Sequence, residues 1–148
     1  MGFHFAFEAL LRLRQSLEHQ QELRLRAANQ QVAKVGRAID QLDEEAKRLR
    51  AESSEHLTSG STSAEIRYTL NSMDALRARR QELEQMAQRV SSIRDQQEAL
   101  FRQARQERET LEILRKQQLQ RYERNQVRRQ QQRLDELFLL RRSFLKPT

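Results

Sequence analysis

The first half of the chain carries an apolar residue at every third or fourth position, and this spacing constrains the fold more than any other feature. The steps alternate between three and four over these positions: Leu25, Ala28, Val32, Val35, Ile39, Leu42, Ala46 and Leu49. A period of 3.5 residues is typical of a helix that buries one narrow stripe against a partner helix. Apolar residues make up only 36% of the chain and aromatic residues 5%, which is too lean for a thick globular core or a β-sandwich.

A second apolar stripe follows beyond the middle of the chain. It keeps mostly the same spacing through these positions: Ile66, Met73, Leu76, Leu83, Met86, Val90, Ile93, Gln97, Leu100, Ala104, Glu107, Leu111 and Leu114. The stretch between the stripes, residues 53–63, is rich in Ser, Thr and Gly. Gly60 suits a left-handed position after a helix, and Thr62 with Glu65 forms a capping box that opens another helix. We expect helices over about 5–56 and 63–141, joined by a loop over about 57–62.

A loop this short makes the two helices antiparallel neighbours. The sequence therefore predicts an all-α fold, a long antiparallel two-helix coiled-coil hairpin in a single domain over residues 1–148. Apolar positions meet across the hairpin when their numbers add up to about 122, which pairs Val32 with Val90 and Ile39 with Leu83. In this register a first helix that begins near Phe5 reaches only to about residue 117. The C-terminal helix is then expected to overhang.

The charge of the chain is concentrated in this C-terminal part. The net charge is +7, and residues 115–148 carry ten basic against three acidic side chains, whereas the rest of the chain is balanced. Residues 115–133, here called the basic segment, hold seven basic residues and one acid, Glu123, with few apolar positions. Residues 134–145, the terminal apolar segment, are rich in Leu and Phe. The basic segment cannot maintain an apolar stripe of its own, so we expect its partner to be another molecule.

Catalytic and metal chemistry find no support in the residues. The chain has no cysteine, and its three histidines, His4, His19 and His56, lack the spacing of metal ligands. No glycine-rich phosphate loop is present, and a thin rod offers no cleft for a catalytic set. Glu107 and Glu109 are interpreted as solvated carboxylates. We expect no enzyme activity, no metal and no cofactor. No apolar run reaches the roughly 20 residues of a membrane span, which favours a soluble cytosolic protein.

Three interpretations of the basic segment remain open. It is a solvated helix in a generic structural spacer, a nucleic-acid-binding module whose arginines neutralise phosphates, or a helix received by an acidic groove in another protein. The absence of interleaved aromatic residues disfavours nucleic acid. The terminal apolar segment, with Arg141 and Arg142, also fits a membrane surface, although packing against the N-terminal Phe residues or a partner is the more ordinary arrangement.

Several features taken together resemble one family, the flagellar export protein FliJ and its type III secretion stalk relatives. They are Phe3-x-Phe5-x-Phe7-x-x-Leu10-Leu11-Arg12-Leu13-Arg14 followed by Glu18, the Gly60-Ser-Thr-Ser loop, Arg105-x-x-Arg108-x-x-Leu111-Glu112-x-Leu114, and Arg133-Leu134-Asp135-Glu136-Leu137. The likeness extends over nearly the whole chain.

The resemblance implies a non-catalytic stalk and escort protein of the flagellar export apparatus. Its implied partners are the export ATPase ring, the cytoplasmic domain of the export gate protein, and export chaperones, with no nucleic acid. Its implied place is the cytoplasm, peripherally associated with the cytoplasmic face of the inner membrane. The expected ring contacts are Phe3, Phe5, Phe7, Leu10, Arg115, Arg121, Arg124, Arg128, Arg129, Leu134 and Leu137. The expected gate contacts follow the loop: Tyr68, Met73 and Leu76.

Overall fold

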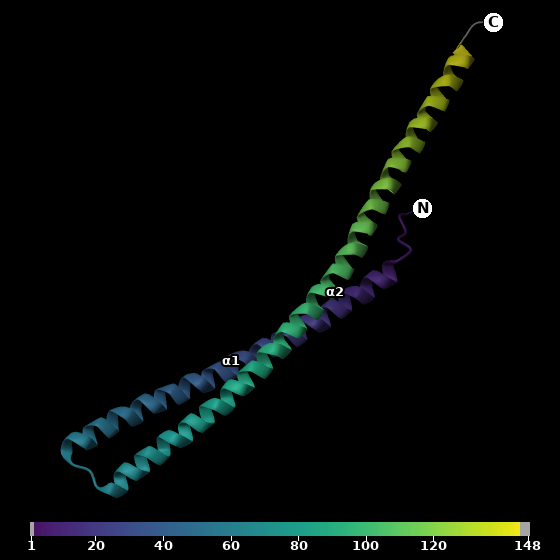
Figure 1. Ribbon diagram of the computed structural model, residues 1–148. Helices are drawn as coiled ribbons and strands as arrows, with labels where there is room; N and C mark the ends of the chain where they lie inside the picture. Colours follow the sequence, from purple (N-terminus) through teal and green to yellow (C-terminus); the bar gives the residue numbers. More distant parts are fainter. Residues whose placement is uncertain (1, 146–148) are drawn as a thin grey trace. The chain divides into compact units, whose positions relative to one another are not determined.

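A computed structural model describes residues 2–145, and these residues are almost entirely helical. Helix α1 spans Glu8–Ser59 and helix α2 spans Ser63–Leu145 (Figure 1). The two long helices pack against each other, 94% of the structure is helical, and the described residues contain no strand. The predicted all-α fold of two packed helices is therefore confirmed.

The connection between the helices is shorter than expected. We expected a loop over 57–62, but α1 continues to Ser59 and only residues 60–62 lie outside the helices. The hydroxyl groups of Thr58 and Ser59 donate hydrogen bonds to the carbonyl oxygen of Glu55, at 2.7 and 3.0 Å. These polar side chains thus bond back to the last turn of the helix rather than to a loop. Gly60, with φ of 88°, then ends α1 in the left-handed region that glycine enters without strain.

The capping box at the start of α2 has formed as the sequence predicts. The Glu65 amide donates to the Thr62 hydroxyl oxygen at 3.3 Å, and the Thr62 amide donates to the Glu65 carboxylate at 3.4 Å. Two amides that would lack a helical partner are satisfied in this way. α2 then runs to Leu145, a few residues beyond the expected end near 141.

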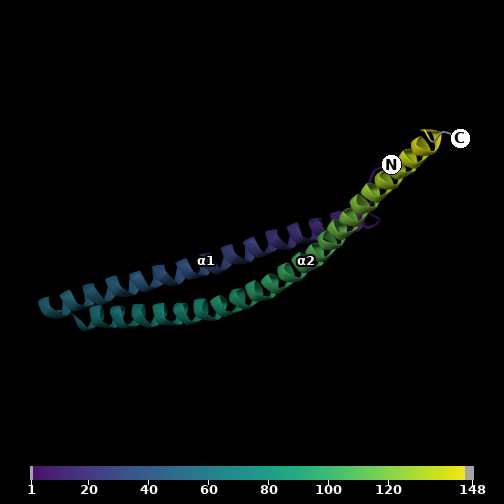
Figure 2. The same cartoon turned by 90° about the horizontal axis from the view of Figure 1, so that it is seen from above.

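The chain forms two compact units, and one of them comprises His19–Arg102. Here the three-residue connection joins α1 and α2 as antiparallel neighbours (Figures 1 and 2). Ala28, Val35 and Leu83 are buried along the stripe that the spacing predicts. An ion pair between Asp43 and Arg80 joins positions whose numbers add up to 123, close to the expected 122.

The other unit combines the residues up to Glu18 with those from Gln103 onward. Phe5 and Leu11 are its buried apolar side chains, and the Phe3 ring lies 5.7 Å from the Tyr122 ring. The N-terminal segment therefore reaches Tyr122, beyond residue 117, which was the expected reach of a first helix that begins near Phe5. The residues before α1 are not helical, and an extended chain advances about 3.3 Å per residue against about 1.5 Å in a helix.

The cap can be tested with Thr62→Ala. We expect a loss of about 1 kcal/mol in the free energy of unfolding, measured by urea unfolding followed by circular dichroism, because one amide of α2 loses its acceptor. Thr69→Ala is the matched control, since that hydroxyl only bonds back to the Glu65 carbonyl within the helix at 3.0 Å. Alanine is a better helix former there, so the control should be neutral or slightly stabilising. Equal losses in the two variants would contradict the role of the cap.

Candidate partner-binding surfaces

Three ion pairs hold the N-terminal part of α1 against α2 in the unit that contains Glu18 and Gln103. The Arg115 Nε donates to the Glu8 carboxylate at 3.1 Å, Arg14 pairs with Glu107, and Arg108 pairs with Glu18. The charges alternate in sign between the two helices, so the pairs also select the register. Glu107 is thus not the solvated carboxylate that we expected, because it forms an ion pair with Arg14.

The pair between Arg108 and Glu18 is the most enclosed of the three. Their side chains are 19% and 18% exposed, and Arg108 also donates to Glu112 at 2.6 Å. The hydrogen bond to Glu18 raises the pKa of Arg108 above its usual value, and Glu112 acts in the same direction. A guanidinium group shared by two carboxylates is a strong, charge-assisted contact, so this point anchors the N-terminal part of α1.

The N-terminal phenylalanines are divided between the interior and the surface. Phe5 is 3% exposed and meets the Phe7 ring edge-on at 5.9 Å, while Phe3 packs on Tyr122. Phe7 and Leu10 remain 45% and 38% exposed. Of the four N-terminal apolar residues expected to contact the ATPase ring, Phe5 therefore supports the fold, and Phe7 with Leu10 offer the larger exposed surface.

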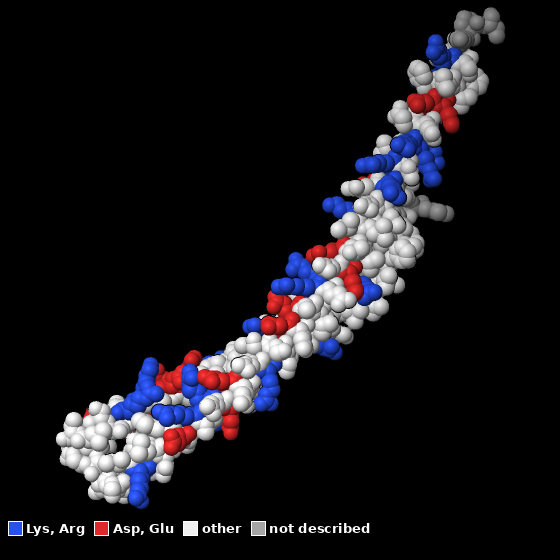
Figure 3. All heavy atoms as spheres, viewed as in Figure 1, with Lys and Arg blue, Asp and Glu red and all other residues white. Residues whose placement is uncertain are grey.

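Beyond Tyr122, α2 is exposed on all sides within its unit. Every described side chain from Glu123 to Leu145 except Gln126 is exposed. The arginines of the basic segment that we expected to contact a partner, Arg121, Arg124, Arg128 and Arg129, all lie at the surface. The space-filling view shows basic side chains gathered on this part of the helix (Figure 3). Arg121, Arg124 and Arg128 follow one another at helical spacing and form a basic stripe on one face.

Arg115, which we also expected to contact a partner, forms an ion pair within the hairpin. Its guanidinium is bound to Glu8, as described above, and its side chain is 44% exposed. The expected contacts at the end of α2, Leu134 and Leu137, are 61% and 62% exposed. The structure therefore brings Phe5 to Phe7, Phe3 to Tyr122 and Arg115 to Glu8, and places the remaining expected ring contacts of the C-terminal part along the exposed end of α2.

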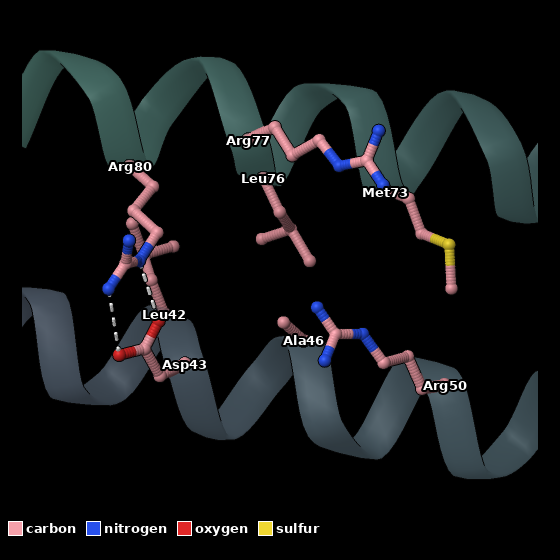
Figure 4. A pocket seen from close by; sticks show the side chains of 8 residues that line it. All are labelled: Leu42, Asp43, Ala46, Arg50, Met73, Leu76, Arg77 and Arg80. Carbon is pink, nitrogen blue, oxygen red and sulfur yellow. Dashed lines mark hydrogen bonds and ion pairs between the residues drawn. The ribbon is translucent and has the colours of Figure 1, made fainter.

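The residues expected to contact the gate lie in the His19–Arg102 unit. Met73 and Leu76 are half-buried and line a cavity between the helices together with Leu42 and Ala46 of α1. In the close-up, Leu76 projects from α2 toward Ala46, Arg50 of α1 extends toward Ala46, and Arg77 lies along α2 (Figure 4). Tyr68 is 72% exposed and lines a neighbouring hollow near the turn. The aromatic ring is thus the accessible part of this surface.

Asp43 and Arg80 close one end of the cavity. Arg80 donates two hydrogen bonds to the Asp43 carboxylate, Nε at 2.8 Å and a terminal nitrogen at 3.4 Å, and also bonds Glu84 at 2.6 Å. The hydrogen bond from Arg80 lowers the pKa of Asp43 below 3.8, with smaller contributions from Lys47 and Arg50. Sequence spacing did not single out this pair, although acidic and basic positions whose numbers add up to about 122 are a usable signal.

Among residues 2–145, no cluster of His, Cys, Asp and Glu is arranged to hold a metal ion. Neither helix, over the same range, is apolar enough over a sufficient length to cross a membrane. The available surfaces are helical faces, which suits binding to other macromolecules.

Comparisons with known proteins agree with this picture. The sequence model of the family described as flagellar FliJ protein matches residues 3–146, nearly the whole chain. No curated protein and no solved structure matches the chain significantly.

The lowered pKa of Asp43 gives a test of the Arg80 contact. Because the carboxylate has a lower pKa in the folded protein, its stabilising contribution is complete above pH 3.8 and is lost as the pH falls through the folded-state value. Arg80→Met should raise the pKa of Asp43 toward 3.8, measured by NMR titration of its side-chain carboxyl carbon. Arg79→Met is the control, since Arg79 bonds Glu82 and not Asp43. An unchanged Asp43 pKa in Arg80→Met would show that the contact is not formed in solution.

Proposed function

The chain belongs to the flagellar FliJ protein family and is thus a component of flagellar protein export, and from this premise we propose that it is a non-catalytic stalk and escort that engages the export ATPase ring and the export gate. The observation that carries the proposal is the C-terminal part of α2, which is helical, basic and exposed from Glu123 onward. A long helix with unsatisfied charge and apolar surface is suited to a binding site in another molecule.

A ring lined by acidic side chains would match the charge of this helix. Attraction between the basic stripe and such a lining steers the helix to its site and weakens as salt screens the charges. The contacts that we propose are the half-buried Phe3 and the exposed members of the expected set: Phe7, Leu10, Arg121, Arg124, Arg128, Arg129, Leu134 and Leu137. Phe5 and Arg115 would act indirectly, by fixing the N-terminal segment beside α2.

The mechanism that we propose is conformational rather than catalytic. A single helix presents different side chains to each subunit of a symmetric ring, so it binds the subunits unequally. Unequal contacts shift the conformational equilibrium of each subunit by the difference in binding free energy between its states. The stalk would stimulate ATP hydrolysis in this way without supplying any group to the reaction.

The second surface that we propose contacts the cytoplasmic domain of the export gate protein. Tyr68 offers an exposed ring, and Met73 with Leu76 lines the cavity further along the same helix. Amphipathic rings are frequent anchors of protein interfaces. We further propose that the protein binds export chaperones, and that it works in the cytoplasm in peripheral association with the export machinery at the inner membrane.

The double variant Arg124→Glu with Arg128→Glu tests the ring contact. We expect its thermal unfolding to remain nearly unchanged, because both side chains are exposed. Capture by the export ATPase ring should weaken at least about tenfold, since two attractions become repulsions, and parent binding should weaken as salt rises. The readouts are pull-down titration and stimulation of ATP hydrolysis.

The matched control is Arg24→Glu with Arg48→Glu, which makes the same change of net charge at exposed positions of α1. This control should bind and stimulate the ring as the parent does. Duplex DNA and RNA serve as competitors and should bind only weakly. If the Arg124 and Arg128 variant stimulates the ATPase normally, the basic stripe is not the ring contact, and preferential nucleic-acid binding would instead support the alternative function.

Tyr68→Ala tests the gate contact separately. Removal of an exposed ring should leave the stability of the hairpin nearly unchanged and should weaken capture of the gate cytoplasmic domain by about 1–2 kcal/mol, measured by isothermal titration calorimetry. Leu57→Ala is the control, because Leu57 is 66% exposed near the same turn but lies on α1. Equal losses of affinity in the two variants would argue against a specific site at Tyr68.

A further inference from the structure

The terminal apolar segment exposes several large apolar side chains close together. Within twelve positions, seven large apolar residues are more than half exposed: Leu134 at 61%, Leu137 at 62%, Phe138 at 66%, Leu139 at 61%, Leu140 at 55%, Phe144 at 86% and Leu145 at 71%. A contiguous apolar surface of this kind normally marks an interaction site.

The spacing in this segment is that of a coiled-coil seam. Leu134, Phe138, Arg141 and Leu145 are separated by steps of four, three and four, so they share one face of α2. The two edges of that face differ in character. Asp135 and Arg142 lie along one edge, and Leu137 and Phe144 lie along the other. The segment therefore has an apolar edge, an apolar seam with one arginine, and an edge with charges of both signs.

We propose that this face binds the same face of a second copy of the chain, as an antiparallel helix pair over residues 134–145. In an antiparallel coiled coil related by a two-fold axis, each edge meets the same edge of the other copy. Leu134 then packs on Leu145 of the second copy, and Leu137 on Phe144 of the second copy. Both contacts occur twice by symmetry, so Leu134, Leu137, Phe144 and Leu145 are covered in the pair.

The charges of the segment fit this arrangement. Along the charged edge, Asp135 lies opposite Arg142 of the second copy, which gives two equivalent ion pairs of opposite sign. In the seam, Phe138 lies opposite Arg141 of the second copy, where a guanidinium over an aromatic face is attractive. An arginine in an otherwise apolar seam thus finds a partner in the antiparallel pair without being buried alone.

A parallel pair would not be compatible with the same sequence. It would place Arg141 directly against Arg141 of the second copy, and it would set the two basic segments side by side along their length. In the antiparallel pair, by contrast, Arg124 and Arg128 lie outside the overlap. Repulsion between like charges therefore selects the antiparallel orientation.

The length of the overlap determines how strong the association is. About 12 residues of helix extend roughly 18 Å, which covers less surface than the interface of a lasting dimer. We expect a reversible dimer with a dissociation constant of roughly 10 μM to 1 mM. This proposal does not rest on the ring contact described above. Because it uses Leu134 and Leu137, binding to a ring and binding to a second copy exclude each other.

The experiment exchanges the charges of one ion pair in the full chain. Asp135→Arg places two arginines opposite each other at both pairs, and Arg142→Asp places two aspartates there. Each variant alone should dimerise at least about tenfold more weakly than the parent. An equimolar mixture of the two variants should recover parent-like dimerisation, because only the mixed dimer restores opposite charges at both positions.

The measurements are sedimentation velocity over a concentration series and energy transfer between chains that carry donor or acceptor dyes. Glu136→Arg is the matched control for Asp135→Arg, since it makes the same charge change at the next residue but on the outer face of the helix. It should dimerise as the parent does, and circular dichroism should show equal helix content in all variants.

Three results would overturn the proposal. A parent chain that stays monomeric up to about 1 mM has no such dimer, and a mixture that fails to recover excludes the antiparallel pairing. Equal weakening by Glu136→Arg would show that only net charge matters. If the monomeric parent instead binds vesicles of anionic lipid through the same residues, the face is a membrane-binding surface and the second copy is not its occupant.

Discussion

The fold depends on one narrow apolar stripe, because two packed helices can hide only the faces that they turn toward each other. Few side chains are deeply buried, namely Phe5, Leu11, Ala28, Val35 and Leu83 among the described residues. Each of these side chains packs in a single layer between the two helices. When one is removed, fewer neighbouring side chains can fill the space than in a globular core. Most of the remaining surface stays available for binding.

Ion pairs provide the specificity that so thin a core cannot. In the unit that contains Glu18 and Gln103, the ion pairs of Glu8 with Arg115 and of Arg14 with Glu107 fix the register of the two helices. The enclosed pair of Glu18 and Arg108 would leave an unpaired charge if the helices slipped. The Phe3 ring contacts Tyr122, and the exposed part of α2 begins directly after it.

The sequence predicted the parts of the fold that depend on local pattern. Spacing by three and four located both helices, and the Thr62–Glu65 box located the start of α2. The end of α1 was placed too early, because Thr58 and Ser59 read as loop residues but bond back to a helical carbonyl. The reach of the N-terminal segment to Tyr122 was missed, since it depends on a non-helical conformation that no spacing reveals.

The candidate surfaces were predicted less well than the fold. Exposure of Arg124 and Arg128 agrees with the charge pattern, but the burial of Phe5 and the pairing of Arg115 with Glu8 depend on contacts across the hairpin. The opposite helix decides which of the N-terminal phenylalanines is buried. The sequence of the N-terminal segment alone does not reveal it.

The three-residue connection between Ser59 and Ser63 has a mechanical consequence. Sliding α1 past α2 by one heptad would separate their ends by a further 10 Å or so, about the full extended length of the three connecting residues. Such a slip would require the capped start of α2 or the glycine-terminated end of α1 to unwind. The connection is therefore too short to absorb such a movement, and an axial force on one helix near the turn is transmitted to the other.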